Sequence, residues 1–193
     1  MNYGELKTNI AAYMKRSDLT SVIPTFIELA ESDIYADVRC QAMETSASIT
    51  LTGETYSHPD GLIEVRRLLI GDDQYYYVTP EEYAQIVDTS ERKFTSIGRT
   101  LYINGGESGD TGTLTYMATF TALASDSDTN WLTENAPEVY LWGALRHACI
   151  YTLDDAGQSR FATLYAGAVE RLNKREAAAR VQGPLWQRVQ SWG

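Results

Sequence analysis

Apolar residues near the start of the chain recur at intervals of three and four, which is the spacing of an amphipathic helix. The first stripe consists of Tyr3, Leu6, Ile10 and Tyr13. A second helix is predicted to begin around Ile23, because Pro24 is tolerated only in a first helical turn. Its apolar stripe consists of Ile23, Phe26, Ile27, Ala30, Ile34 and Val38. Its acidic residues are expected on the other faces; they are Glu28, Glu31, Asp33 and Asp37.

From about residue 45 the pattern changes to the alternation of apolar and polar residues that is typical of strands. Strand-like segments occupy residues 46–52, 62–70, 75–78, 99–103 and 112–118. The last two flank the glycine-rich loop 104–112 and predict a hairpin. Thr79 and Pro80 suit the start of a short helix. Residues 45–120 are therefore predicted to form a mostly antiparallel β unit inserted between helices.

The segment 139–153 predicts a helix that is apolar on nearly every side, interrupted only by Arg146, His147 and Thr152. Such a helix must be buried all round, so it lies at the centre of a core or is covered in part by another subunit. At about 1.5 Å per residue it spans roughly 22 Å, which is too short to cross a membrane.

A last amphipathic helix is predicted from a stripe that continues through a charged end to the break at Gly183 and Pro184. The stripe consists of Phe161, Leu164, Tyr165, Ala168 and Leu172. The predicted fold class is therefore α+β, an α-helical bundle with an inserted, mostly antiparallel β unit and an extended C-terminal tail. The predicted parts are residues 1–44 and 121–182 for the bundle, 45–120 for the insert and 183–193 for the tail.

Composition is that of a globular chain, with 44% hydrophobic and 22% charged residues among 193. The net charge of −10 argues against nonspecific binding to a nucleic-acid backbone. Charge is unevenly distributed, since residues 171–193 carry five basic residues and one acidic residue. The acidic body and the basic tail are expected to meet different partners.

The sequence shows no apolar run of membrane length, and its first residues lack the basic and then apolar pattern of a signal peptide. Cys40 and Cys149, both in predicted helices, are expected to be free thiols in a cytosolic chain.

No catalytic, metal or cofactor constellation stands out from the residue pattern. His58 precedes a turn, and His147 is expected to be a hydrogen-bonded histidine of the core or an interface. A nucleophilic triad needs more than an inventory of His, Ser and Asp, and no Gly-x-Ser-x-Gly elbow is present. We therefore expect a protein that is not an enzyme and binds no cofactor.

Three weaker patterns favour structural roles. The acidic pairs 126/128 and 154/155 lack the other ligands of a calcium loop and suit helix caps or solvated loops. The glycines of loop 104–112 have no Lys-Ser/Thr partner for a phosphate site. Tyr75 and Tyr77 should share one face of a strand and Tyr76 the other, which suits packing more than stacking on bases or sugars.

The C-terminal segment carries large apolar residues at helical spacing. Leu185, Val189 and Trp192 follow an i, i+4, i+7 pattern, with Trp186 alongside. A helix this short is marginal alone and gains order in a groove, on its own body or on a neighbour. The Gly-Pro break and the positive charge favour docking on a neighbour. The predicted docking residues are Arg180, Leu185, Trp186, Arg188, Val189 and Trp192.

These segments in this order resemble the head-to-tail adaptor (connector) proteins of tailed bacteriophages, including the tail tubular protein A type of short-tailed phages. The resemblance rests on residues 61–68, 78–83, 114–116 and 129–145. The last of these is the most specific and begins Thr129-Asn130-Trp131-Leu132. The glycine-rich loop 104–112 and residues 57–60 depart from the family pattern.

The resemblance implies a structural virion protein that forms a ring of twelve copies under the portal and leaves a channel for DNA. Its implied partners are the portal protein, a tail or nozzle protein, other copies of itself, and DNA that passes without specific binding. It would lie in the virion neck after assembly in the bacterial cytoplasm, without a membrane. The tail would then dock on the portal or a neighbouring subunit, and the β unit would contact the next tail component.

Two other classes stay open at this point. One is another phage tail-completion or assembly protein. The other is a small hydrolase or sugar-binding module, which a clustered polar pocket would support.

Overall fold

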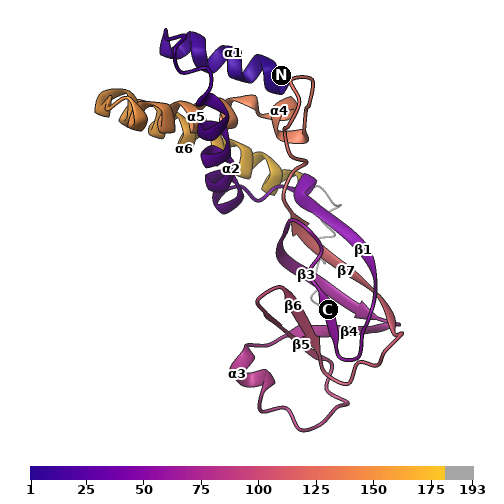
Figure 1. Cartoon of the computed structure of the whole chain (residues 1–193). Helices are drawn as coiled ribbons and strands as arrows, with labels where there is room; N and C mark the ends of the chain where they lie inside the picture. The colour runs from indigo at the N-terminus through magenta and orange to yellow at the C-terminus, as the bar shows by residue number, and fades with distance from the viewer. Residues whose placement is uncertain (181–193) are drawn as a thin grey trace, which may run out of the picture. The chain divides into compact units, whose positions relative to one another are not determined.

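The computed structural model describes residues 1–180, and the chain forms two compact units. Among the described residues, 1–41 and 120–180 make the helical unit, and Ala42–Thr119 make the β unit. The fold is α+β, with a seven-stranded sheet in the second unit (Figure 1). Within residues 1–180, no helix combines the length and apolar character that a membrane span requires.

Helix α5 (Pro137–Tyr151) lies at the centre of the helical unit and contacts the four other helices of that unit. These are α1 (Tyr3–Met14), α2 (Ile23–Asp37), α4 (Trp131–Asn135) and α6 (Asp155–Arg180). Val139, Tyr140 and Leu145 are fully buried. A Cβ atom at Gly143 would lie 3.0 Å from the Cβ of Ala30, so this glycine lets α2 approach closely.

The prediction that α5 is apolar all round is correct for most of its length, and a single copy buries that part. Its C-terminal end differs, because Ile150 and Tyr151 are more than half exposed and Leu153 beyond it is 88% exposed. Another difference is α4, a short helix that the pattern did not predict. Asn130 begins it, and the Asn130 side chain accepts a hydrogen bond of 3.0 Å from the Thr133 amide.

The β unit begins with a 3-10 turn (Gln41–Met43) and contains one short helix, α3 (Pro80–Tyr83). As predicted, Thr79 caps α3: its hydroxyl accepts a hydrogen bond from the Glu82 amide, and the Glu82 carboxylate accepts one from the Thr79 amide. The strands are β1 (Glu44–Thr50), β2 (Thr55–Ser57), β3 (Leu62–Ile70), β4 (Asp73–Tyr77), β5 (Lys93–Ile97), β6 (Thr100–Ile103) and β7 (Thr111–Ala118). Their order is β1-β7-β3-β4-β5-β6-β2, and only the β4–β5 pair is parallel.

The predicted hairpin of residues 99–103 and 112–118 is wrong. Strand β6 pairs with β5 and β2, whereas β7 pairs with β1 and β3. The glycine-rich segment between them therefore crosses from one part of the sheet to another. Strands β2, of three residues, and β5, of five residues, were not predicted.

Candidate interaction sites

The β unit has a groove of about 770 Å³ where the sheet opens between β3 and β5. Strand β4 pairs with Leu68–Ile70 of β3 through its first residues. It then pairs with Lys93 and Phe94 of β5 through Tyr76 and Tyr77. The earlier residues of β3 are not covered by β4, so the groove forms beside them.

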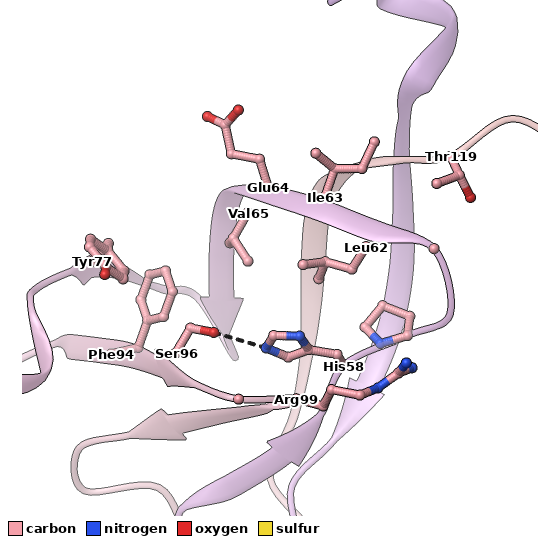
Figure 2. Close-up of a pocket in the computed structure, with 13 residues that line it drawn as sticks. His58, Leu62, Ile63, Glu64, Val65, Tyr77, Phe94, Ser96, Arg99 and Thr119 are labelled. Atoms are coloured by element: carbon pink, nitrogen blue, oxygen red, sulfur yellow. Dashed lines mark hydrogen bonds between the residues drawn. The ribbon is translucent and has the colours of Figure 1, made fainter. Parts of the chain in front are cut away.

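Apolar side chains from both strands line the groove. Figure 2 shows Leu62 and Val65 on the side of β3 that faces His58 and Ser96, with Ile63 and Glu64 on the opposite side. The register between β3 and β7 shifts at Ile63, which marks a β-bulge. The extra residue explains why Ile63 and Glu64, neighbours in sequence, share one side.

His58 lies at one end of this groove and has no catalytic constellation around it. His58 Nε2 and Ser96 Oγ are hydrogen-bonded at 3.0 Å, the dashed line of Figure 2. Burial, and then the charge of Arg99, lower the pKa of His58, so the ring is neutral at pH 7. In the described part of the chain, no carboxylate is hydrogen-bonded to the ring, which a triad would require to orient it.

In the helical unit, Asp33 links α2 to α5. Its Oδ2 is bonded to the Arg146 guanidinium and lies 2.6 Å from His147 Nε2. The Tyr165 hydroxyl of α6 donates to Asp37 at 3.1 Å. His147 is therefore a hydrogen-bonded histidine between helices, as predicted. Asp37 is exposed, as expected for a residue outside the apolar stripe, whereas Asp33 is half-buried and joins α2 to α5.

Substituting His58 or His147 by Ala, one at a time, is expected to leave assembly competence intact. The first change removes the contact to Ser96 and the second removes the contact to Asp33, and each should cost about 1 kcal/mol of folding stability. The measurement is assembly of the purified variant with its partner proteins, with its unfolding midpoint as the folding control. A hydrolytic activity of the wild-type protein that disappears with either change would contradict a noncatalytic role.

Glu31 belongs to a second buried polar network, which joins α2 to α5 and the start of α4. The Tyr140 hydroxyl donates to Glu31 at 3.1 Å and accepts from Asn130 at 3.0 Å. Burial raises the pKa of Glu31, and the Tyr140 hydrogen bond opposes this shift. Burial also raises the pKa of Tyr35 to about 12. Glu31 was also expected on a face away from the apolar stripe. Instead, its carboxylate accepts a hydrogen bond from the hydroxyl of the buried Tyr140.

The substitution Glu31→Gln is expected to raise the free energy of unfolding at pH 7 and to weaken its dependence on pH. Because the pKa of Glu31 is raised in the folded state, its contribution to the free energy of unfolding is fully present below about pH 4.5, the ordinary pKa of a glutamate. It is lost as the pH rises through the folded-state value. Glutamine keeps an acceptor for the Tyr140 hydroxyl without a buried charge.

The measurement for this variant is urea unfolding between about pH 4 and 8, the range that brackets the titration of a buried carboxyl. Glu81→Gln is the control for the loss of an exposed carboxylate, because Glu81 is exposed and lies in the other unit. A Glu31→Gln protein less stable than wild type at pH 7 would show that the fold needs the carboxylate anion.

The other sequence candidates have structural partners. Asp128 accepts backbone hydrogen bonds from Ala124 and Ser125, and Asp154 accepts one from Gly157, so these carboxylates cap turns. Within residues 1–180, no group of three or more His, Cys, Asp or Glu could hold a metal ion. Tyr75 is buried, whereas Tyr76 and Tyr77 are exposed on the surface of the β unit.

Neither Cys40 nor Cys149 forms a disulfide within the described residues, as predicted, and both side chains are buried. Cys40 lies just after α2 rather than in a helix. Of the six predicted docking residues, Arg180 is the last residue of α6. The other five, Leu185, Trp186, Arg188, Val189 and Trp192, lie outside the described residues.

Comparison with protein-family models gives the decisive observation. The model described as SU10 adaptor protein matches residues 1–188, nearly the whole chain. The chain belongs to the SU10 adaptor protein family. A search of curated proteins found none that matches it.

Membership of the SU10 adaptor family indicates where the protein acts and which proteins it contacts. The protein is a phage head-to-tail adaptor, a structural component of the virion between head and tail, where portal and tail components are its partners. The groove of the β unit and the exposed apolar residues at the end of α5 are therefore candidate contacts with other proteins. The sequence did not predict the β3–β5 groove, since it depends on where the short strand β4 ends.

Proposed function

We propose that this SU10 adaptor forms a ring of twelve copies beneath the portal, joins the capsid to the tail and leaves a channel for DNA. The family match over residues 1–188 supports this proposal most directly. In this respect the protein would be similar to the tail tubular protein A type of short-tailed phages. Its copies would assemble in the host cytoplasm and remain in the virion neck.

The two units would act as separate domains with different tasks. We assign the ring body to the helical unit, with its helices arranged as a bundle around α5. Ile150, Tyr151 and Leu153 leave an apolar surface exposed at the end of α5, which a single copy does not bury. Exposed apolar clusters of this kind mark protein contacts, and a neighbouring subunit would cover this one.

DNA would pass through the ring without specific binding. The chain carries 26 acidic and 16 basic residues, and the basic excess is confined to its C-terminal part. A wall of negative charge repels phosphates, so DNA would slide along the channel without adhering to it. Such a surface would favour ejection of the genome.

The β unit is expected to contact the next tail component. The chain enters and leaves this unit between α2 and α4, so its loops can bind a partner without changing the helices. Hydrogen exchange on adaptor-bound portal particles, before and after tail attachment, should show slower exchange in loops of residues 45–120. Exchange at the centre of α5 should not change, because that segment is already buried.

Unchanged exchange throughout residues 45–120 on tail attachment would rule out this contact. Slower exchange only in the helical unit would place the tail component there instead.

A further inference from the structure

The turn between α5 and α6 presents an exposed leucine in a backbone conformation that favours glycine. Leu153 has a φ of 57° and an exposed fraction of 88%. The Leu153 amide donates to the Ile150 carbonyl at 3.2 Å, and the Asp154 amide donates to the Cys149 carbonyl at 2.9 Å. This pair of hydrogen bonds ends a helix with a left-handed residue that is usually glycine. A single copy therefore gives no reason for a leucine here, since the side chain adds backbone strain and buries almost none of its surface.

The same helical unit has a mainly apolar groove along α6, with a volume of about 680 Å³. Tyr165 and Val169 line the groove and are buried, so they form its floor. Ala162, Ala166 and Ala177 line it from the same face of α6, and their small side chains leave the space above the floor open. The volume lies within the range of about 300–1,000 Å³ that is usual for ligand pockets, so the groove can accept a leucine side chain.

We propose that Leu153 of one copy inserts into this groove on α6 of the next copy, so that the ring is built from head-to-tail contacts. The inference rests on the ring of the proposed function and names the two surfaces that form its contact. Leu153 cannot fill the groove of its own copy, because the middle of the groove, near Val169, lies roughly 20 Å further along α6. Two different patches that fit each other make a heterologous contact, and such contacts close into a ring when the rotation between copies allows it.

The distribution of charge along α6 favours this arrangement. Leu153 is followed directly by Asp154 and Asp155, whereas residues 171–175, toward the far end of the groove, include three basic residues and no acidic residue. Insertion of Leu153 brings the acidic turn of one copy toward the basic part of its neighbour's α6. Complementary charge of this kind orients two surfaces as they associate.

Two acidic residues also line the groove, and each has a partner within its own copy. Asp37 accepts a hydrogen bond of 3.1 Å from the Tyr165 hydroxyl. Glu170 is paired with Lys174 at 2.6 Å, and both side chains of this pair are more than half exposed. An exposed pair of this kind contributes little free energy, so Lys174 is able to bind a carboxylate of the neighbouring copy instead.

The test is a disulfide between copies of the full-length adaptor assembled on its portal. One variant combines Leu153→Cys with Ala166→Cys, and its matched control combines Leu153→Cys with Ala178→Cys. Ala178 is also exposed on α6 but does not line the groove. Both variants keep the buried Cys40 and Cys149, so background oxidation is the same.

We expect a ladder of covalent multimers on a non-reducing gel for the residue 166 variant, at least about tenfold more than for the residue 178 variant. A disulfide forms only where the two Cα atoms lie within about 7 Å, which the groove would allow and the other face of α6 would not. Equal yields from both variants would contradict insertion into the groove. Covalent dimers from Leu153→Cys alone would show that Leu153 meets Leu153 of another copy, which would overturn a head-to-tail contact.

The substitution Leu153→Gly separates the contact from the fold. Glycine suits the left-handed backbone, so the unfolding midpoint should equal or exceed that of wild type. The protein concentration needed to form rings on portal should rise about tenfold or more, because the contact loses a buried leucine. A Leu153→Gly protein that forms rings as readily as wild type would overturn the inference and leave the proposed ring standing. A wild-type protein that forms no ring on portal would contradict the proposed function and this inference together.

Discussion

Deletion of residues 184–193 is expected to give a folded, soluble protein that no longer joins heads to tails. The segment lies beyond α6, and the buried apolar residues described for both units precede it in the chain. Trp186 and Trp192 are residues of the type that dominates interface energies, and truncating such a residue commonly costs about 2 kcal/mol or more. That cost corresponds to roughly a 30-fold loss of affinity for each tryptophan.

The measurement is the affinity of the truncated protein for portal, with thermal unfolding as the folding control. Trp186→Ala and Trp192→Ala should weaken binding singly, whereas Gln187→Ala and Gln190→Ala serve as controls of the same segment. Salt should weaken the wild-type complex further if Arg180 and Arg188 bind an acidic surface. Undiminished portal affinity after truncation would show that the tail is not the anchor.

The substitution Gly112→Ala is expected to destabilise the β unit by about 2 kcal/mol or more, the usual cost of an overpacked site. Gly112 lies on β7 between β1 and β3, opposite Ile49 and Ile70. A Cβ atom there would overlap the carbonyl oxygen of Leu69 and lie 2.8 Å from the Cδ1 atom of Ile70. Backbone atoms cannot move aside without breaking the ladder, so the strain cannot relax cheaply.

Gly167→Ala is the matched control, because Gly167 lies in the middle of α6. Its nearest neighbour would be Arg171 Nη1 at 3.5 Å, which is an ordinary contact. Alanine in a helix interior should stabilise the protein by up to about 1 kcal/mol. Urea unfolding measures both effects. A Gly112→Ala protein as stable as wild type would contradict this prediction, because it would show that a methyl group fits beside Leu69 and Ile70.

The helices and the longest strand could be predicted because each repeats its pattern over many residues. Tyr3, Leu6 and Ile10 mark the buried face of α1, and all three are buried. Strand β3 has the same residues that the sequence predicted, 62–70. The wrong hairpin shows where local patterns fail, since strand pairing depends on contacts between residues far apart in the chain.

The polar networks of the helical unit were also not predicted from the sequence. Glu31 and Asp33 have the spacing of solvent-facing residues, and only their long-range partners Tyr140 and His147 show otherwise. One signal could have found the first pair, because a tyrosine in an apolar helix needs a partner for its hydroxyl group. The groove of the β unit gave no such signal, since it arises where β4 leaves β3.

The most direct test of the proposed ring is cryo-electron microscopy of the full-length protein mixed with its portal. We expect a twelve-fold ring seated under the portal, with a continuous central channel. The apolar residues Ile150, Tyr151 and Leu153 should lie at the contact between neighbouring copies. A single copy bound to portal, or a ring with its centre closed to DNA by the folded chain, would contradict the proposal.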